Sequence, residues 1–482
     1  MRLAWVVLGV GLAACGTDVD DSTAQPPPPP RATWYQDAGP IISTHCMSCH
    51  QAGGIAPFAL TTIDDARDNA QLMLQQIAAG TMPPWEAQTE ADCTPRFGWQ
   101  DDPTLTDQEK TTLQWWLDDG LAAGTVADVP VPPTPALTGV TQTLAPAQSF
   151  TAAGTRDQFM CTVLDPGVAS FAWLTGLQVR PGNPGVVHHA VIAEVFPTGA
   201  NADAIAGQAT GVPWDCSEQQ LPADLILNIW TPGNQPMQTP AELAVPILGG
   251  AKLVMQIHYH PAGTIAEPDT TSLDLRTSQT WPQKMYFVGA FGNASAAPEL
   301  LPDPDDRGAP EFRIPADAAY HQEHMQFTVG DLGTLTNVQL YSVNAHMHMI
   351  GTHINSSIVR PAARGADPQT ECLANGGWNF DWQRTYVYDA PIAQLPTVQA
   401  GDVIDVNCHW DNTLDNPFEQ RALADAGLGA PVDVTLGEGN STDEMCLEIF
   451  GISADAPAMP AVARTLTVEQ MPAALLATMK RM

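Results

Sequence analysis

The sequence predicts a mainly β protein with a small helical domain near its N-terminal end. Forty-three prolines and 38 glycines interrupt the 482 residues, and long runs of helix-forming residues are few, which favours many short strands joined by turns. The two segments with a helical pattern, about 64–79 and 113–121, both lie before residue 125. A chain of this length is too long for one ordinary domain, so two or three domains are expected.

The chain is strongly acidic. It contains 53 acidic and 19 basic residues, which gives a formal net charge of −34. Because binding to nucleic acid depends on basic surface stripes, nucleic acid is excluded as a partner. The hydrophobic fraction of 44% is still large enough to build cores, so the acidic residues are expected to form a solvated surface.

The first 15 residues resemble a bacterial lipoprotein signal peptide. Arg2 precedes an apolar run that is too short to span a bilayer and ends in Leu-Ala-Ala-Cys15. This ending predicts cleavage before Cys15 and a lipid on its thiol; the alternative is a plain signal peptide with an incidental cysteine. Residues 16–31, rich in proline, would then form a tether. The expected location is the periplasm or the cell surface, with the lipid in the outer membrane.

The first motif with a chemical meaning is Cys46-Met47-Ser48-Cys49-His50, the C-x-x-C-H pattern of c-type haem attachment. Its two thiols bond to the haem, and His50 then binds the iron. Met82, on a loop that two prolines fix, is the expected second axial ligand. The alternative is a thiol redox pair with a methionine in the core. The predicted domains are a cytochrome c-like domain that carries haem c at 32–125 and a proline-rich linker at 126–139.

Beyond the linker, histidines gather in three short motifs. His258 and His260 form one H-x-H pair and His346 and His348 form another, and on a strand this spacing puts both imidazoles on one face. The doublet His188-His189 would point to opposite faces unless the strand ends or bulges there. Three histidines with an open position would suit zinc as well as copper, so the first set alone leaves the metal open.

These segments, followed by Thr-Asp-Glu-Met445-Cys, resemble in order and character the copper type II, ascorbate-dependent monooxygenases, the family of peptidylglycine alpha-hydroxylating and dopamine beta-monooxygenase. The resemblance covers roughly residues 140–455. It implies two tandem antiparallel β-sandwich domains of jelly-roll type, each carrying one copper ion on a shared solvent-filled cleft. We place these two domains at 140–310 and 311–482.

The resemblance also implies the ligands of two copper ions. His188, His189 and His258 would bind the electron-donating copper, and His346, His348 and Met445 would bind the copper that activates O2. A thioether selects Cu(I) and weighs against zinc. His260 is assigned to the surroundings of the first ion rather than to its ligands. Four further histidines match no ligand motif and are expected to be structural or to lie at the surface: His321, His324, His353 and His409.

The expected activity is hydroxylation of a C–H bond with O2, with electrons supplied through the haem by an ascorbate-like or periplasmic redox donor. The peptide-hydroxylating members carry an arginine, an asparagine and a tyrosine where this chain has Asn344, Leu447 and Ile449. A charge-assisted anchor is missing there, so a small neutral or aromatic substrate is expected. The alternative function is that of a non-catalytic, copper-binding electron-transfer cytochrome.

Six cysteines remain after Cys15 and the C-x-x-C pair are set aside. Export predicts that they form disulfides. The resemblance places Cys408 and Cys446 on neighbouring strands and therefore pairs them. The next pair is Cys161 with Cys216, and Cys93 and Cys372 are left over.

Overall fold

The computed structural model describes residues 29–456, apart from residues 53–55, 88–92, 134, 155, 218, 261–262, 295 and 438–441. The predicted signal peptide with Cys15, and the predicted tether as far as residue 28, lie outside the described residues. Strands greatly outnumber helices in the described part, so the prediction of a mainly β chain is confirmed. No described helix is both long and apolar enough to cross a membrane.

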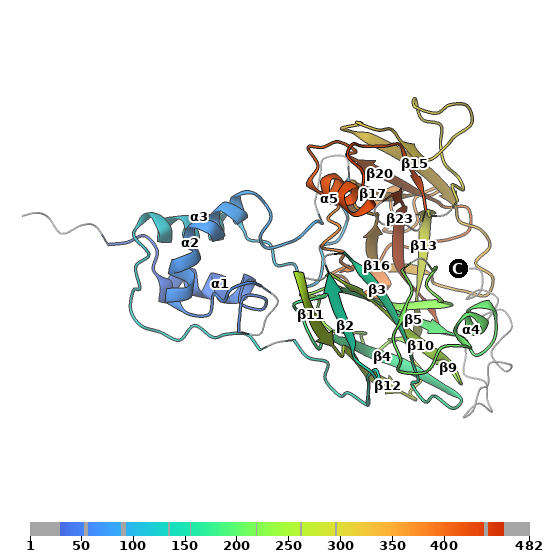
Figure 1. The fold of residues 1–482 in the computed structure, drawn as a ribbon, viewed down its shortest axis with the longest axis horizontal. Coiled ribbons are helices and arrows are strands. Elements are labelled where there is room, and N and C mark those ends of the chain that lie inside the picture. The colour runs from blue at the N-terminus through green and yellow to red at the C-terminus, as the bar shows by residue number, and fades with distance from the viewer. Residues whose placement is uncertain are drawn as a thin grey trace, which may run out of the picture.

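The helical part lies at one side of the molecule (Figure 1). Its core contains two indoles, Trp34 and Trp116, whose ring centroids are 5.5 Å apart. The first predicted helix agrees with the structure to within one residue at each end. The second begins earlier than predicted, because Thr106 caps it by accepting a hydrogen bond from the backbone N–H of Glu109. The elements of this part are η1 (Trp34–Ala38), α1 (Gly39–His45), α2 (Ile63–Ala78) and α3 (Asp107–Asp118).

The first β-sandwich packs a five-stranded sheet against one half of a nine-stranded sheet. In its strand β10, Leu253 and Met255 point into the core between the sheets, whereas Val254 points to the opposite face and packs beside Cys161 and Cys216. The five-stranded sheet has the order β6 (Trp214–Asp215), β3 (Gln158–Leu164), β10 (Lys252–Tyr259), β5 (Val187–Val195) and β7 (Leu225–Trp230). The half-sheet that it covers has the order β1 (Gln142–Leu144), β12 (Ser272–Ser278), β4 (Phe171–Arg180) and β9 (Leu243–Leu248), with β8 (Met237–Gln238) beside β4.

The second β-sandwich packs a four-stranded antiparallel sheet against the other half of the nine-stranded sheet. Strand β13 lies before the predicted domain boundary at residue 310, yet it pairs along its whole length with β23 of this sandwich. The four-stranded sheet has the order β15 (His321–Thr328), β20 (Val403–Trp410), β17 (Gly351–Val359) and β18 (Thr370–Gly377). The half-sheet opposite has the order β13 (Lys284–Asn293), β23 (Cys446–Asp455), β16 (Gln339–His346) and β19 (Tyr386–Val387).

The remaining described elements are short and lie at the edges of the two sandwiches. They are the strand pair β2 (Phe150–Gly154) and β11 (Gly263–Asp269), the strands β14 (Arg313–Ile314), β21 (Val434–Leu436) and β22 (Asp443–Glu444), and the helices α4 (Ala200–Ile205), α5 (Pro417–Ala426) and η2 (Ile392–Gln394).

Three disulfides tie the strands and segments together; the two predicted pairs are confirmed, and the two cysteines that were left over form the third. Their partners are Cys161 and Cys216, Cys408 and Cys446, and Cys93 and Cys372. The last pair fixes the chain between α2 and α3 to β18, so part of the predicted 32–125 domain lies on the second sandwich. Nearby, the indole of Trp99 stacks on the ring of Tyr388 with centroids 4.8 Å apart. Such disulfides indicate an oxidising compartment.

Candidate metal centres and the adjoining cavity

Three histidines meet at the end of two neighbouring strands, β5 and β10. Val187 pairs with Tyr259 and His189 pairs with His258, so His188 is the extra residue of a β-bulge. A bulge turns the side chain of its extra residue away from the regular alternation. The sequence predicts either a strand end or a bulge if both histidines of the doublet are to reach one ion, and the structure contains the bulge.

The Nδ1 atoms of these histidines form a nearly equilateral triangle. The distances are 3.2 Å from His188 to His189, 3.2 Å from His188 to His258 and 3.3 Å from His189 to His258. Nitrogens bound to one tetrahedral ion at about 2.0–2.1 Å would lie about 3.3–3.4 Å apart. A neutral imidazole has one N–H, which points at one partner only. A shared cation therefore accounts for the triangle better than mutual hydrogen bonds do.

Carboxylates hold the outer nitrogens of this triangle. Nε2 of His258 lies 2.9 Å from Oδ2 of Asp157, and Nε2 of His188 lies 3.3 Å from Oδ1 of Asp381. A carboxylate in this position orients a metal-binding imidazole and raises its basicity. The other oxygen of Asp157 lies 2.6 Å from Nδ1 of His260, whose side chain is 48% exposed. His260 thus contacts the surroundings of the centre and is not part of the triangle. This agrees with its assignment from the sequence.

Burial keeps the buried imidazoles of this centre neutral, which is the form that binds metals. Burial lowers the pKa of His258 to about 4, although its hydrogen bond with Asp157 opposes the shift. Burial, and then the neighbouring His258 and His188, lower the pKa of His189 well below its usual value. His346 of the second sandwich adds to this lowering, so the two sets of histidines are within electrostatic reach of each other.

The second set lies where β16 ends and β23 begins. His346 is the last residue of β16 and His348 follows beyond the strand, so this pair does not share one strand face as predicted; the imidazole centroids are nevertheless only 5.5 Å apart. Nδ1 of His348 lies 2.9 Å from the carbonyl oxygen of Asp443, and Nδ1 of His346 lies 3.3 Å from Oε1 of Gln383. These contacts use Nδ1 and leave Nε2 of each ring available to bind a metal. Burial lowers the pKa of both rings, that of His348 to about 3.

Met445 is positioned by its neighbours rather than by a regular strand. It is 6% exposed and precedes β23, in which Leu447 pairs with His346. The buried carboxylate of Glu444 accepts hydrogen bonds from the backbone N–H groups of His348 at 2.7 Å, Ile350 at 2.9 Å and Met445 at 3.2 Å. One side chain thus fixes the turn that carries His348 to the segment that carries Met445.

The C-x-x-C-H motif lies at the end of α1, and its residues fit a covalent haem. Cys46 and Cys49 are free, whereas the other six cysteines of the described residues are paired. Nδ1 of His50 lies 3.0 Å from the carbonyl oxygen of Phe58, which leaves Nε2 for an iron. Burial lowers the pKa of His50 and favours the neutral ring. Met82 is 40% exposed, and its role as second axial ligand stays a prediction.

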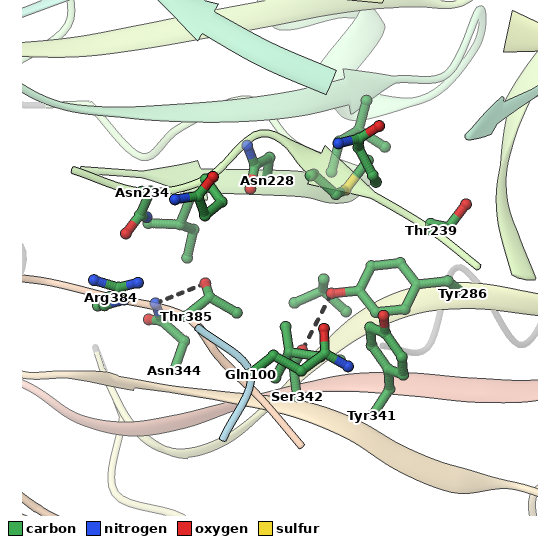
Figure 2. Close-up of a pocket in the computed structure, with 18 of the residues that line it drawn as sticks. Gln100, Asn228, Asn234, Thr239, Tyr286, Tyr341, Ser342, Asn344, Arg384 and Thr385 are labelled. Carbon is green, nitrogen blue, oxygen red and sulfur yellow. Dashed lines mark hydrogen bonds between the residues drawn. The ribbon is translucent and has the colours of Figure 1, made fainter. Parts of the chain in front are cut away.

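A cavity of about 360 Å³ opens between the two sandwiches (Figure 2). Asn344 and Ile449, two of the three positions that the resemblance connects with substrate, line it; Leu447 does not. The lining is more polar than the sequence predicted, because it includes Asn228, Asn234, Tyr286, Tyr341, Ser342, Arg384 and Thr385. The guanidinium of Arg384 also lies 4.8 Å from the ring centroid of Trp85. The cavity therefore contains a cation, which is supplied by Arg384 and not by position 344.

The four histidines without a motif lie in the second sandwich. His324 is bonded to Asp405 at 2.9 Å, and the rings of His353 and His409 have centroids 5.3 Å apart. His321 forms a further potential metal-binding group with Asp303 and Asp305.

Several residues of the two centres were missed in the sequence: Asp157, Asp381, Gln383 and Glu444. Only Glu444 carried a signal, as an acidic residue within a recognised motif.

No family model matches this chain, and no curated protein matches it. Among solved structures, the major capsid protein of bacteriophage PM2 matches with 8% identity and a TM-score of 0.24, over 66% of this chain and 98% of that chain. A structure of infectious bursal disease virus, Gx strain, matches with 10% identity and a TM-score of 0.16, over 67% and 74%. Allantoicase matches with 10% identity and a TM-score of 0.15, over 55% and 84%. These scores are too low to carry an argument about fold or function.

Proposed function

We propose that this protein is a copper-dependent monooxygenase that hydroxylates a C–H bond of a small molecule with O2 and receives its electrons through a c-type haem. The observation that carries the proposal is the triangle of Nδ1 atoms from His188, His189 and His258. Its spacing is that of three ligands on one ion, and its surroundings keep His189 and His258 neutral. We also propose that both β-sandwiches are of the jelly-roll type.

The two centres differ in a way that suits two tasks. Three imidazoles bind copper in either oxidation state, so the first centre suits storage and transfer of one electron. His346, His348 and Met445 include a soft thioether that favours Cu(I), the state that reacts with O2. The copper ions supply the redox chemistry with O2. The chain holds the ligands rigid, keeps the imidazoles neutral and binds the substrate beside the second centre.

The cavity is the proposed substrate site, because Asn344 lies two residues before His346 and lines it. The side-chain amide of Asn344 donates a hydrogen bond to the hydroxyl of Thr385 at 3.1 Å, which fixes one wall. Neutral and aromatic small molecules fit its tyrosine-lined end, and the amides of Asn228 and Asn234 offer partners for polar substituents.

Haem c would be bound through Cys46, Cys49 and His50, with Met82 as the proposed sixth ligand. An ascorbate-like or periplasmic donor would reduce it. A lipid on Cys15 would keep the protein at the outer membrane, facing the periplasm or the cell surface.

The test is metal and haem analysis followed by the Met445→His variant. We expect two copper ions and one covalent haem per chain, and O2 uptake with some members of a panel of small C–H compounds. Imidazole is also a good copper ligand, so Met445→His should retain both ions, yet lose at least about 2 kcal/mol of transition-state stabilisation, or some thirtyfold in rate. Met325→Leu, a buried methionine in β15, is the matched control and should turn over normally. Normal turnover by Met445→His, or a chain that binds no copper, would overturn the proposal.

A further inference from the structure

The segment that joins β18 to β19 contacts both histidine centres. The ring centroid of Phe380 lies 6.3 Å from that of His188 and 6.0 Å from that of His258. In the next residue, Asp381, a carboxylate oxygen lies 3.3 Å from Nε2 of His188, and Oε1 of Gln383 lies 3.3 Å from Nδ1 of His346. A few consecutive residues of the second sandwich therefore connect a centre of the first sandwich with a centre of the second.

The same segment also reaches the C-x-x-C-H motif. A Cβ added to Gly233, in the loop between β7 and β8, would lie 3.1 Å from the indole of Trp382 and 3.4 Å from Sγ of Cys49. Gly233 has a φ of +84°, which favours glycine, and its missing side chain lets both the indole of Trp382 and the thiol of Cys49 lie close to its backbone. Three parts of the chain meet at this point: the helical part through Cys49, the first sandwich through Gly233 and the second sandwich through Trp382.

We propose that Trp382, with Asp381 beside it, is the residue that electronically couples the haem-attachment motif to the first copper centre. This inference rests on the proposed function. Cys49 would carry a haem thioether, the indole of Trp382 and Sγ of Cys49 lie on either side of Gly233, and a carboxylate oxygen of Asp381 lies 3.3 Å from the outer nitrogen of His188. The path runs through neighbouring covalent bonds and short contacts, with one gap at the indole. With both groups bound, the haem would give up one electron and the copper would accept it, while the indole of Trp382 would keep its oxidation state.

The backbone at Trp382 is fixed by the contacts of the preceding residue, Asp381. Asp381 is held on both sides, by His188 at 3.3 Å and by the guanidinium of Arg421 at 2.9 Å, so the backbone that carries Trp382 is fixed. A smaller side chain would leave a space next to Cys49 without disturbing the bonds of Asp381.

The test is the rate at which the reduced haem is reoxidised by the copper, followed by haem absorbance in a stopped-flow instrument without O2 or substrate. Trp382→Leu should slow this step at least about tenfold, which corresponds to roughly 1.4 kcal/mol. Trp382→Phe should restore most of the rate, because it keeps a ring beside Cys49. Trp281→Leu, which removes an indole that packs in the first sandwich against Phe171 and Trp173, is the matched control and should keep the wild-type rate.

Haem content, copper content and haem potential are measured for each variant. If haem and copper are present as in the wild type and Trp382→Leu transfers electrons at the wild-type rate, the inference fails while the proposed function stands. If the wild-type chain carries no covalent haem or no copper, the proposed function fails and takes this inference with it. A rate that is slowed in the leucine variant and restored by phenylalanine, at unchanged haem potential, supports the coupling. A merely structural residue would not change the electron-transfer rate while leaving the haem potential unchanged.

Discussion

Replacing Asp157 with asparagine should weaken copper binding at the first centre without unfolding it. One oxygen of Asp157 lies 2.9 Å from Nε2 of His258 and the other lies 2.6 Å from Nδ1 of His260. Asparagine has one oxygen, so it can accept a hydrogen bond from only one of these rings, and it presents N–H groups to the other. The substitution also removes the negative charge that makes His258 a stronger ligand.

The expected loss follows from the geometry. Removal of a carboxylate behind a metal-bound histidine typically costs 10–100-fold in affinity, or about 1.4–2.7 kcal/mol. The upper part of this range is expected for Asp157, because its side chain is only 16% exposed and His258 is fully buried, so solvent screens their interaction little. Asp381→Asn should cost less, since that carboxylate is 46% exposed, lies 3.3 Å from His188 and is shared with Arg421.

The assay is competition for Cu(I) with a chromophoric chelator, read separately for the tight and the weak ion. His260→Ala is the matched control, because it removes the second partner of Asp157 and leaves the carboxylate on His258; its affinity should stay close to that of the wild type. An Asp157→Asn protein that binds both ions as tightly as the wild type would show that Nδ1 of His258 is not a ligand.

Two further predictions concern stability. The hydrogen bond to Asp405 raises the pKa of His324 above its unfolded value, so the pair stabilises the fold below about pH 6.5 and loses this effect as the pH rises through the raised pKa. His324→Gln should lower the free energy of unfolding, measured by urea denaturation at pH 5.5, by less than about 1 kcal/mol because the ring is partly exposed. It should leave this free energy unchanged at pH 9, and an equal loss at both pH values would contradict the prediction. Replacing Cys93 and Cys372 together by serine should cost about 2–5 kcal/mol and raise hydrogen exchange around Trp99, which packs beside that disulfide on Tyr388; unchanged exchange there would show that the packing alone holds the segment.

What the sequence could predict was local or carried by a motif. The bulge at His188 followed from two histidines in an apolar strand, since a regular strand cannot turn both toward one point. That the six cysteines pair followed from their number and the predicted export, whereas the pairing of Cys408 with Cys446 was implied by the family resemblance. The second H-x-H pair shows the limit of such reasoning, because His348 lies beyond the end of β16 and its ring is placed by Asp443 rather than by strand alternation.

What the sequence could not predict depends on contacts between distant segments. Asp157 precedes β3, and only the pairing of β3 with β10 brings it to His258. Arg384 enters the cavity because β19 pairs with β16 next to Asn344. No periodicity or spacing links these residues. The prediction that the pocket has no charged anchor was based on Asn344, and it missed the cation of Arg384, which comes from the neighbouring strand.

The segment that carries Met445 is held from two sides, which bears on the proposal that its thioether, a weak ligand, binds copper. The disulfide from Cys446 to Cys408 ties the residue after Met445 to the four-stranded sheet. The carboxylate of Glu444 ties the residue before it to the turn of His348, and it is fully buried. Burying a carboxylate is costly: burial raises the pKa of Glu444 to about 7, and three backbone N–H groups of the two segments offset part of this cost. A ligand fixed in this way loses little conformational entropy when a metal binds. If the sulfur of Met445 binds copper as proposed, its preference for Cu(I) would set the chemistry of the centre, while the backbone around it supplies the position.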